Sequence, residues 1–383
     1  MRNDFLKIAY INDQIFPCQD TDCEQIMQTV STMGKKEDVH FVIPQKRGTE
    51  PPTVNELADH YQVDPSFKLS FAKSLFPTAR FIEKPAHAIA GVLNKTVKNS
   101  TVIYTRNIPT VLAALFFSNK FVFYETYRNW PDQIFFMGWL FRRISRRKKF
   151  GGIILHSQFA ADSFIKAGVS PGKVIAKRNG YDPNRIKPVL SKEEARKKLD
   201  LPQNGTIVTY AGHVSPKKGI MGILDLAGSN KDALFVIAGS KGRTPVEERA
   251  EKMDNVLIVP WLKFDKVVEY LYASDILIIP PTLGPLEKVG NTVLPIKTFL
   301  YMACNRVIFG PLSPDLSGVL IDGTNAKLVK PDNFDEADKG LKELIESPAL
   351  CKHLAKKAYD DVKDLTYQKR SEDIIDFIKN RLS

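Results

Sequence analysis

The sequence has few cysteines and no clear metal-binding pattern. Four cysteines among 383 residues are too few for a disulfide scaffold. We therefore expect reduced thiols that pack as small buried hydrophobes at Cys18, Cys23, Cys304 and Cys351. The spacing of Cys18 and Cys23 matches no common zinc-binding pattern, so we expect no metal there.

Long apolar runs are also missing. No apolar run approaches the roughly 18 residues needed to cross a bilayer, and residues 1–7 lack the apolar stretch of a signal peptide. These absences predict a cytoplasmic protein. A hydrophobic content of 43% is typical of globular chains, and the length is enough for about two domains.

The positive charge is distributed unevenly along the chain. The formal net charge of +12 indicates anionic partners. Residues 1–185 carry +10 of it and residues 186–383 only +2. No nucleic-acid-binding motif accompanies the charge, so we expect no nucleic-acid partner.

Much of this charge lies in residues 135–150, where large apolar side chains precede six cations. On a helix, this pattern is typical of a membrane-surface anchor, because aromatic rings enter the headgroup region while cations meet anionic lipid. We therefore expect peripheral contact with an anionic membrane, at its inner face. A buried helix that ends in a solvated basic turn remains the alternative.

Short apolar runs rich in β-branched residues recur through both halves of the chain. Nearly continuous apolar runs are typical of strands covered on both faces. We expect strands at residues 7–12, 39–44, 101–106, 121–125, 152–157, 174–179, 206–212, 233–239, 255–261, 276–281, 306–311 and 326–331.

Helical stretches separate many of these runs. Capping boxes predict helix starts after Thr21, Ser191 and Thr244. Strand, helix and parallel strand repeated in each half predict an α/β protein with two doubly wound, Rossmann-like domains. Two such domains would face each other across a cleft that holds the ligands.

A turn-rich break at residues 179–183 predicts the domain boundary. We expect an N-terminal domain at 1–182 and a C-terminal domain at 183–366. Residues 367–383 carry apolar positions at helical spacing and can pack back on the first domain.

Two loops have features of a phosphate-binding site. Gly212 ends an apolar strand, and Lys218-Gly219 then opens a helix. A second strand is followed by Gly290, and a helix begins near Lys297. Glycine admits a ligand close to the backbone, and lysine and helix N-termini attract phosphate. An ordinary solvated lysine is the alternative for Lys218.

These loops and their flanking stretches together resemble the retaining glycosyltransferases of the GT-B fold, in particular family four, a large nucleotide-sugar-dependent group. The resemblance spans nearly the whole chain. It rests on residues 156–182, on the Gly212-His213 to Lys218-Gly219 loop, on Tyr272-Ala273-Ser274-Asp275, and on the Pro-x-Lys-x-Phe-Leu-Tyr-Met-Ala stretch at 295–303.

The resemblance implies a nucleotide diphosphate sugar as donor, bound by the second domain, with the acceptor on the first. Lys218 and His213 would neutralise the diphosphate, and Trp261 would lie against the base. The remaining residues implied at the donor site are Gly212, Gly290, Asn291, Thr292, Lys297 and Leu300. No metal is implied, because cations and helix N-termini stabilise the leaving phosphate.

Two positions depart from the family pattern. The glutamate that grips the nucleotide ribose in the family is Leu300 here, and leucine accepts no hydrogen bond. Residues 123–127 resemble a strand end where the family often has Glu-x-His, so that Glu125 matches the glutamate while Tyr127 replaces the histidine. Tyr127 is a poor base at neutral pH.

The resemblance implies catalytic roles for Tyr127, Glu125, Arg106 and Lys218. Arg106 follows a strand on the expected ligand side and can meet a phosphate or the acceptor, or form an ordinary structural ion pair. The expected function is transfer of a sugar, with retention, to a glycan or lipid-linked acceptor in surface polysaccharide or glycoconjugate assembly. A sugar-nucleotide epimerase and a non-catalytic subunit that supports a partner transferase are the alternatives.

Overall fold

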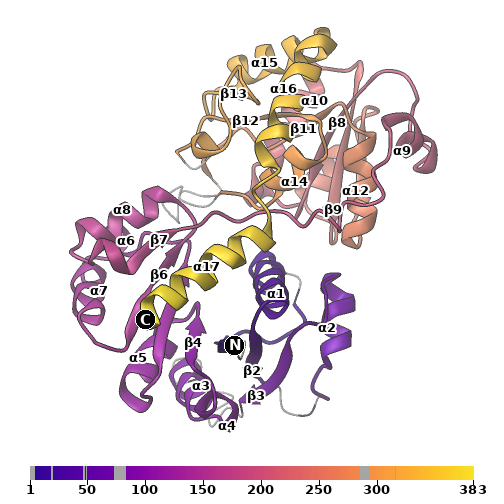
Figure 1. The fold of residues 1–383 in the computed structure, drawn as a ribbon. Coiled ribbons are helices and arrows are strands. Elements are labelled where there is room, and N and C mark those ends of the chain that lie inside the picture. Colours follow the sequence, from indigo (N-terminus) through magenta and orange to yellow (C-terminus); the bar gives the residue numbers. More distant parts are fainter. Residues whose placement is uncertain are drawn as a thin grey trace. The chain divides into compact units, whose positions relative to one another are not determined.

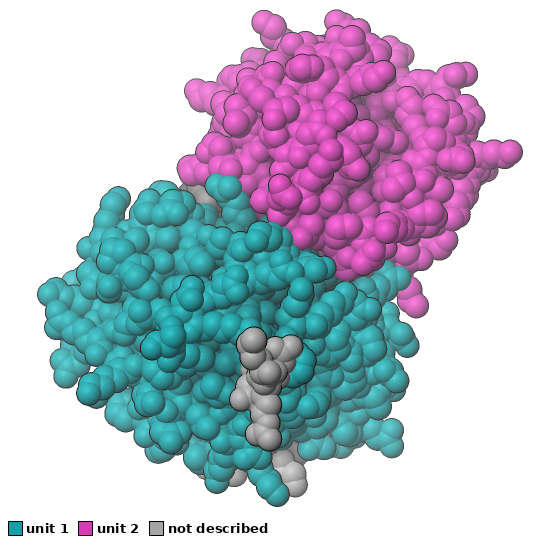
Figure 2. Space-filling view, viewed as in Figure 1, with its two compact units in different colours: residues 1–179, 367–383 teal, residues 180–366 magenta. Residues whose placement is uncertain are grey.

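The computed structural model describes residues 5–18, 20–45, 48, 50–72, 83–284, 294–314 and 316–383 (Figure 1). The chain forms two compact units (Figure 2). Unit 1 contains residues 1–179 and 367–383, and unit 2 contains residues 180–366. The division thus falls between Asn179 and Gly180, whereas the sequence placed it after Asp182.

Unit 1 is built on a parallel sheet that has seven strands in the described residues, in the order β3-β2-β1-β4-β5-β6-β7. The strands are β1 (Lys7–Ile11), β2 (Asp38–Pro44), β3 (Lys68–Ala72), β4 (Val102–Thr105), β5 (Phe121–Thr126), β6 (Phe150–Leu155) and β7 (Val174–Ala176).

Strand β3 is the one strand of this sheet that the sequence did not predict. Among the described residues it pairs with β2 alone, at the edge of the sheet, and most of its side chains are half-buried. An edge strand needs no continuous apolar run, so the pattern that revealed the central strands is missing here.

Helices cover both faces of the sheet in unit 1. Apolar side chains of α1 (Thr21–Gly34), α2 (Val54–Tyr61) and α17 (Tyr367–Leu382) fill one core. Helix α17 lies against α1 and thereby joins the end of the chain to unit 1 (Figure 1). The other core is filled from α3 (Glu83–Val92), α4 (Lys95–Lys98), α5 (Ile108–Phe117), α6 (Trp130–Gln133), α7 (Met137–Ser145) and α8 (Gln158–Lys166).

Unit 2 repeats this plan with a parallel sheet of six strands among the described residues, in the order β10-β9-β8-β11-β12-β13. Its strands are β8 (Thr206–Ala211), β9 (Ala233–Ser240), β10 (Val256–Pro260), β11 (Ile276–Ile278), β12 (Val307–Pro311) and β13 (Lys327–Val329). Its helices are α9 (Lys192–Lys198), α10 (Ile220–Ser229), α11 (Pro245–Ala250), α12 (Phe264–Ala273), α14 (Lys297–Ala303), α15 (Phe334–Glu346) and α16 (Pro348–Val362).

These two sheets confirm the predicted α/β class with two doubly wound units. In each sheet the strand order reverses at one point, between β1 and β4 in unit 1 and between β8 and β11 in unit 2. Open parallel sheets bind ligands outside the carboxyl ends of their strands at such a switch point. The fold therefore provides one candidate crevice in each unit.

The helix starts follow the sequence in two cases out of three. Ser191 and Thr244 form the predicted capping boxes of α9 and α11. The capping box at Thr21 is wrong, because α1 begins at Thr21 itself and its N-cap residue, Asp20, makes no side-chain cap hydrogen bond. Within the described part of the chain, we find no helix whose length and apolarity would suit a membrane span.

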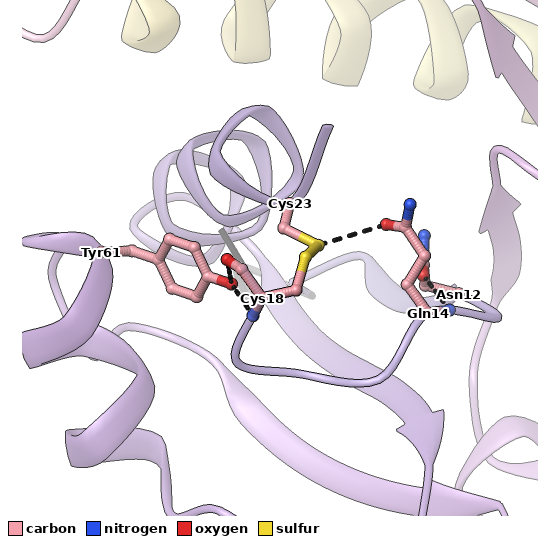
Figure 3. Close-up of a disulfide and its surroundings, with 5 residues drawn as sticks. All are labelled: Asn12, Gln14, Cys18, Cys23 and Tyr61. Carbon is pink, nitrogen blue, oxygen red and sulfur yellow. Dashed lines mark hydrogen bonds between the residues drawn. A yellow bond between two sulfur atoms is a disulfide. The ribbon is translucent and has the colours of Figure 1, made fainter. Parts of the chain in front are cut away.

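The prediction of four reduced thiols is wrong for one pair, because Cys18 and Cys23 form a disulfide (Figure 3). The loop after β1 turns back on the start of α1, and this brings the two sulfur atoms together. Cys304 is a buried free thiol and Cys351 a half-buried one.

Candidate active site

The carboxyl end of β8 in unit 2 is shaped by two glycines. Gly212 follows β8 with φ +150°, and a Cβ there would lie 2.7 Å from the Lys297 Nζ and 3.0 Å from the Tyr210 hydroxyl. A Cβ on Gly239, at φ +116°, would collide with the carbonyl oxygen of Gly212. Only glycine fits these positions, so the backbone of the loop stays uncovered next to a lysine.

Lys297 lies at the start of α14, and its ammonium is 3.8 Å from the centroid of the Tyr210 ring. Burial, together with the nearby charge of Lys218, lowers the pKa of Lys297 to about 7. Within the described residues, no carboxylate forms an ion pair with this ammonium. A desolvated cation held over an aromatic face without a counterion is suited to binding an anion.

Lys218 approaches the same place from the loop after β8. It ends a short 3₁₀ turn, Pro216–Lys218, and Gly219 at φ +75° then begins α10. Lys218 and His213 are both exposed, and the carbonyl of His213 accepts a hydrogen bond from the Tyr210 hydroxyl at 3.1 Å. The structure thus brings together Gly212, Lys218 and Lys297 as the sequence predicted, with His213 on the same loop.

The hydroxyl of Tyr301 attaches α14 to the end of β8. It accepts a hydrogen bond from the Ala211 amide at 2.8 Å, and the side chain is fully buried. This contact fixes the helix that carries Lys297. The sequence motif includes Tyr301, but it gives no indication of this positioning role.

The other predicted donor residues are less informative. Leu300 packs against the apolar core of unit 2. Trp261 follows β10 with 43% of its surface exposed, and its backbone amide donates to the Ser240 carbonyl at 2.7 Å. The predicted positions Gly290, Asn291 and Thr292 lie outside the described residues.

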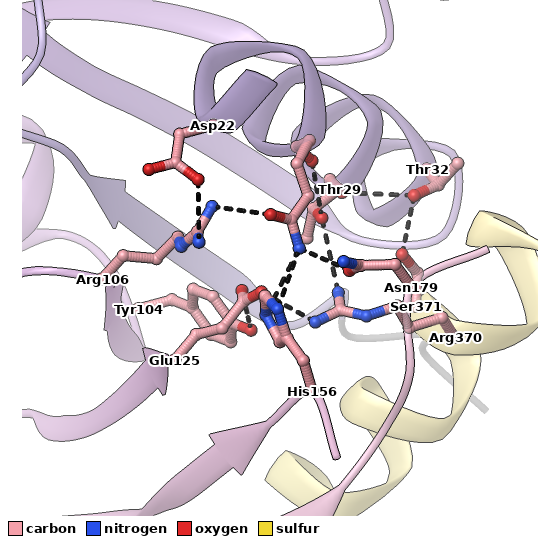
Figure 4. A network of polar contacts seen from close by, with 11 residues as sticks. Asp22, Thr29, Thr32, Tyr104, Arg106, Glu125, His156, Asn179, Arg370 and Ser371 are labelled. Carbon is pink, nitrogen blue, oxygen red and sulfur yellow. Dashed lines mark hydrogen bonds and ion pairs between the residues drawn. The ribbon is translucent and has the colours of Figure 1, made fainter. Parts of the chain in front are cut away.

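In unit 1, Glu125 lies at the centre of a buried polar network (Figure 4). It sits on β5 and is 1% exposed. Its Oε1 accepts from Arg370 of α17 and from His156 Nε2, each at 2.7 Å, and its Oε2 accepts from the Tyr104 hydroxyl at 2.6 Å. Both carboxylate oxygens are therefore occupied by partners inside the unit, and the expected catalytic role of Glu125 stays a prediction.

The charges of this network follow from its geometry. Burial opposes ionisation of Glu125, but Arg370, the hydrogen bond from His156 and Arg106 hold the pKa of its carboxyl well below the usual range. Burial lowers the pKa of His156 to about 4, so its ring is neutral at pH 7. The neutral ring donates from Nε2 to Glu125 and offers Nδ1 as an acceptor.

Arg106 occupies the end of this network, at the switch point of the sheet. It follows β4, and its side chain is 9% exposed. One of its terminal nitrogens donates to Gln25 Oε1 at 3.1 Å, and the other lies 3.6 Å from Asp22 Oδ1. The guanidinium carbon is 5.8 Å from the centroid of the Tyr127 ring.

Gln25, on α1, joins Arg106 to the rest of the network. Its amide nitrogen donates to Asn179 Oδ1 and lies 3.3 Å from His156 Nδ1. Sequence reasoning missed Gln25 and Arg370. Of the two, Arg370 could have been found from the sequence, because it is a charged residue within the apolar face of the last helix.

Tyr127 is half-buried beside this network. Its ring lies 6.1 Å from the His156 ring, and burial raises the pKa of its phenol above the ordinary value. The phenol is therefore protonated at neutral pH. It can donate a hydrogen bond to a ligand, but it cannot act as a base.

The basic segment at residues 135–150 is an amphipathic helix with its flanks. Phe141 and Ile144 of α7 are buried in unit 1. Phe135 is fully exposed, 63% of the Trp139 surface is exposed, and the Arg143 guanidinium lies 5.6 Å from the Trp139 ring. The buried inner face matches the alternative reading of this segment, and the aromatic and basic outer face matches the membrane-anchor reading.

Comparisons with known proteins agree with this architecture. Residues 191–361 match the model of the family "Glycosyl transferases group 1". WcaI of Escherichia coli strain K12, described as a colanic acid biosynthesis glycosyl transferase, is 24% identical over 200 residues. That match covers 48% of this chain and 47% of WcaI, so it spans about half the length of this relative.

Solved structures match over nearly the whole chain. HepE of Anabaena, in a complex with UDP and glucose, has a TM-score of 0.70 at 14% identity, over 98% of this chain and 100% of that one. Sucrose-phosphate synthase of Thermosynechococcus elongatus has a TM-score of 0.76 at 15% identity, over 98% and 99%. Residues 191–361 therefore resemble the glycosyl transferases group 1 family, on a chain whose fold is that of solved GT-B glycosyltransferases.

Proposed function

We propose that this chain is a retaining glycosyltransferase that moves a sugar from a nucleoside diphosphate sugar to a glycan or lipid-linked acceptor in surface polysaccharide or glycoconjugate assembly. One observation carries the proposal. Lys297 lies beside the uncovered backbone at Gly212, at the switch point of unit 2, and Lys218 is close enough to lower the pKa of its ammonium, while neither lysine pairs with a carboxylate in the described residues. The UDP and glucose in the HepE complex support a UDP-sugar as donor.

In this proposal the donor diphosphate binds at the carboxyl end of β8. Lys297 and Lys218 neutralise its charge, His213 adds a hydrogen bond, and the N-terminus of α10 contributes free amides. As the bond to the sugar breaks, negative charge grows on the leaving phosphate. Two fixed cations stabilise that charge most where it is greatest, which lowers the barrier.

The proposal needs no metal ion. The charge that a divalent cation would supply to the leaving diphosphate comes here from Lys218 and Lys297. We therefore expect the affinity for the donor to be the same with and without EDTA.

The acceptor is assigned to unit 1 at the switch point between β1 and β4. Arg106 reaches this crevice and offers a guanidinium to an anionic or hydroxyl group of the acceptor, while the Tyr127 phenol can donate a hydrogen bond. Glu125 acts behind them as a positioning residue, through His156 and Gln25.

Sugar transfer itself is the test of this function. A panel of labelled nucleotide sugars is incubated with the protein and a glycolipid extract, and a Lys218→Ala variant serves as the inactive control. We expect one donor to lose its label to the extract with the wild type and much less with the variant. Consumption of no donor, or release of an epimerised nucleotide sugar without any acceptor, would contradict the proposal.

Leu300 bears on the alternative of a non-catalytic subunit. A leucine at this position cannot hold a ribose hydroxyl, so we expect Leu300→Glu to tighten UDP binding about three- to tenfold, the effect of one charge-assisted hydrogen bond. Leu300→Gln is the matched control, with a smaller gain. Calorimetric titration with UDP measures both. An unchanged affinity in both variants would favour the non-catalytic subunit.

We also propose that the outer face of α7 contacts an anionic membrane. Neutralising Arg142, Arg143, Arg146 and Arg147 should weaken cosedimentation with vesicles of phosphatidylglycerol and phosphatidylcholine at least tenfold at 50 mM salt, and less at 300 mM, because salt screens the attraction. The control replaces the exposed unit 2 residues Lys231, Lys241, Lys252 and Lys339 with Gln. Equal losses in the two variants would show a general charge effect and refute the assignment to α7.

A further inference from the structure

The disulfide between Cys18 and Cys23 lies in the segment that follows β1, one of the two strands at the switch point of unit 1. Cys18 belongs to the loop that leads from β1 to α1, and Cys23 lies in the first turn of α1 (Figure 3). Cys18 is half-buried, whereas Cys23 is fully buried. The two residues close a short ring of backbone that includes Asp22.

Other contacts hold the same loop on its two sides. The Tyr61 hydroxyl accepts from the Cys18 amide and donates to the Cys18 carbonyl, each at 2.7 Å. Near β1, the Gln14 amide donates to Asn12 Oδ1 at 2.7 Å. The disulfide adds a covalent cross-link between this loop and α1.

The surroundings of Cys23 also suit a free thiol. Its sulfur lies 3.4 Å from the Oε1 of Gln14. A sulfur in a disulfide has no proton to donate, but a Cys23 thiol could donate one to this oxygen without any rearrangement. The site is therefore prepared for the reduced as well as the oxidised state.

The disulfide is adjacent to the residues that hold Arg106. Asp22 directly precedes Cys23 and lies 3.6 Å from one nitrogen of Arg106. Gln25, two residues further along α1, accepts from the other nitrogen at 3.1 Å. A change in the loop or in the first turn of α1 thus acts directly on the Arg106 side of the crevice.

We propose that Cys18 and Cys23 are a redox modification site, which a dithiol reductant opens by attack on Cys18, and that opening it frees the β1–α1 loop beside Arg106. A thiolate of the reductant attacks Cys18 Sγ, the S–S bond breaks, and Cys23 leaves as a thiolate that takes a proton from water. The second thiol of the reductant then displaces Cys18, which is protonated in turn. Two electrons pass to the protein, and the reductant leaves as a disulfide.

The direction of attack follows from exposure. Cys18 is the accessible sulfur, because Cys23 is buried. Cys23 is therefore the leaving group, and its thiolate forms at the N-terminus of a 14-residue helix. Glutathione disulfide re-forms the bond: Cys18 attacks it to give a mixed disulfide with one glutathione while the other leaves as a thiolate, and the Cys23 thiolate then displaces the bound glutathione.

Local charge selects among reductants. Asp22 and Glu24 flank Cys23 in the sequence, and Glu24 and Asp20 lie near enough to the Tyr61 phenol, a partner of Cys18, to help raise its pKa. An anionic thiol such as glutathione is repelled, whereas an uncharged dithiol such as dithiothreitol is not. At equal thiolate concentration and low salt, dithiothreitol should therefore open the bond several-fold faster, and the difference should shrink at high salt.

The redox step is tested on the folded full-length protein by alkylation and mass spectrometry. Protein treated with glutathione disulfide, then denatured and alkylated, should carry label on Cys304 and Cys351 only. Brief dithiothreitol treatment of the folded protein before alkylation should add label at Cys18 and Cys23. Label on Cys18 and Cys23 without reductant, or resistance of the bond until the protein is unfolded, would overturn the proposal.

The effect on the loop is tested by hydrogen–deuterium exchange. We expect reduction to speed exchange at least threefold in peptides from residues 12–25 and to leave residues 206–229 of unit 2 unchanged. The Cys18→Ser/Cys23→Ser variant should exchange like the reduced protein and ignore dithiothreitol. Equal exchange in the oxidised and reduced wild type would show that the bond does not restrain the loop.

Any effect of this disulfide on acceptor binding rests on the proposed function. The alkylation and hydrogen–deuterium exchange experiments, however, use neither a nucleotide nor an acceptor. Thermal stabilisation by UDP, which depends on unit 2, should be the same before and after reduction. A missing UDP effect with intact redox behaviour would refute the donor assignment alone. A present UDP effect with no redox behaviour would refute the switch alone.

Discussion

Replacing Lys297 with methionine is expected to make the protein more stable and unable to bind UDP. The pKa of Lys297 falls from its ordinary 10.5 to about 7 in the folded protein. The unfolded chain therefore binds this proton more tightly, and the buried ammonium costs stability in full below pH 7. Methionine is similar in size, packs well on Tyr210 and carries no charge.

We expect Lys297→Met to raise the free energy of unfolding at pH 7 by about 1–3 kcal/mol, a value discounted because part of the side chain reaches solvent. As pH rises from 7 towards 10.5, the wild type loses the proton and the difference should vanish. Thermal unfolding at pH 6.5, 8 and 9.5 measures this convergence. A variant less stable than wild type at pH 6.5 would show that Lys297 contributes to the fold rather than to anion binding.

Replacing Arg370 with methionine should have the largest effect on unit 1. It removes the paired cation from Glu125 and leaves a buried carboxylate whose hydrogen-bond partners are all neutral, which costs about 3–5 kcal/mol. Urea unfolding in a Trp261→Phe background measures the effect, because the remaining tryptophans, Trp130 and Trp139, both belong to unit 1.

Two controls separate the buried pair from general damage to α17. Lys369→Met removes an exposed cation one position away and should change stability by less than about 0.5 kcal/mol. Adding Glu125→Gln to Arg370→Met removes the stranded charge and should recover part of the loss. A double variant no more stable than Arg370→Met would mean that the helix contact, not the charge pair, carries the stability.

The sequence was a good guide to the central parts of both sheets. Strands covered by helices on both faces appear as apolar runs, as with Phe150–Leu155, and local patterns such as the capping box at Ser191 mark helix starts. Edge strand β3 escaped detection because it is only partly buried. The N-cap residue of α1 was predicted wrongly because Asp20, Thr21 and Asp22 are all residue types that favour the N-cap position.

The candidate site was predictable where its residues follow strands in the sequence. Lys218 and Arg106 each follow a strand that ends at the switch point of its unit. Contacts between distant segments were not predictable. Arg370 and Glu125 are hydrogen-bonded although 245 positions separate them in the sequence. The residues around Glu125 in the sequence do not indicate that its carboxylate is hydrogen-bonded inside the unit.

The candidate sites of the two units differ in how their cations are paired. In unit 2, Lys297 and Lys218 have no carboxylate partner among the described residues, and a diphosphate at Gly212 would supply negative charge. In unit 1, Arg106 is already held by Gln25 and Asp22. The large positive charge of the first half of the chain lies mostly elsewhere, on surfaces such as α7.

Titration calorimetry of the wild-type protein with UDP tests the donor site most directly. At pH 7.5, in two buffers with different ionisation heats, we expect binding of UDP with net uptake of protons, as Lys297 is protonated beside the diphosphate. Uridine should not bind measurably, and Lys297→Met should lose both the affinity and its share of the proton uptake. No binding of UDP at millimolar concentration, or equal binding by the wild type and Lys297→Met, would contradict the assignment of this site.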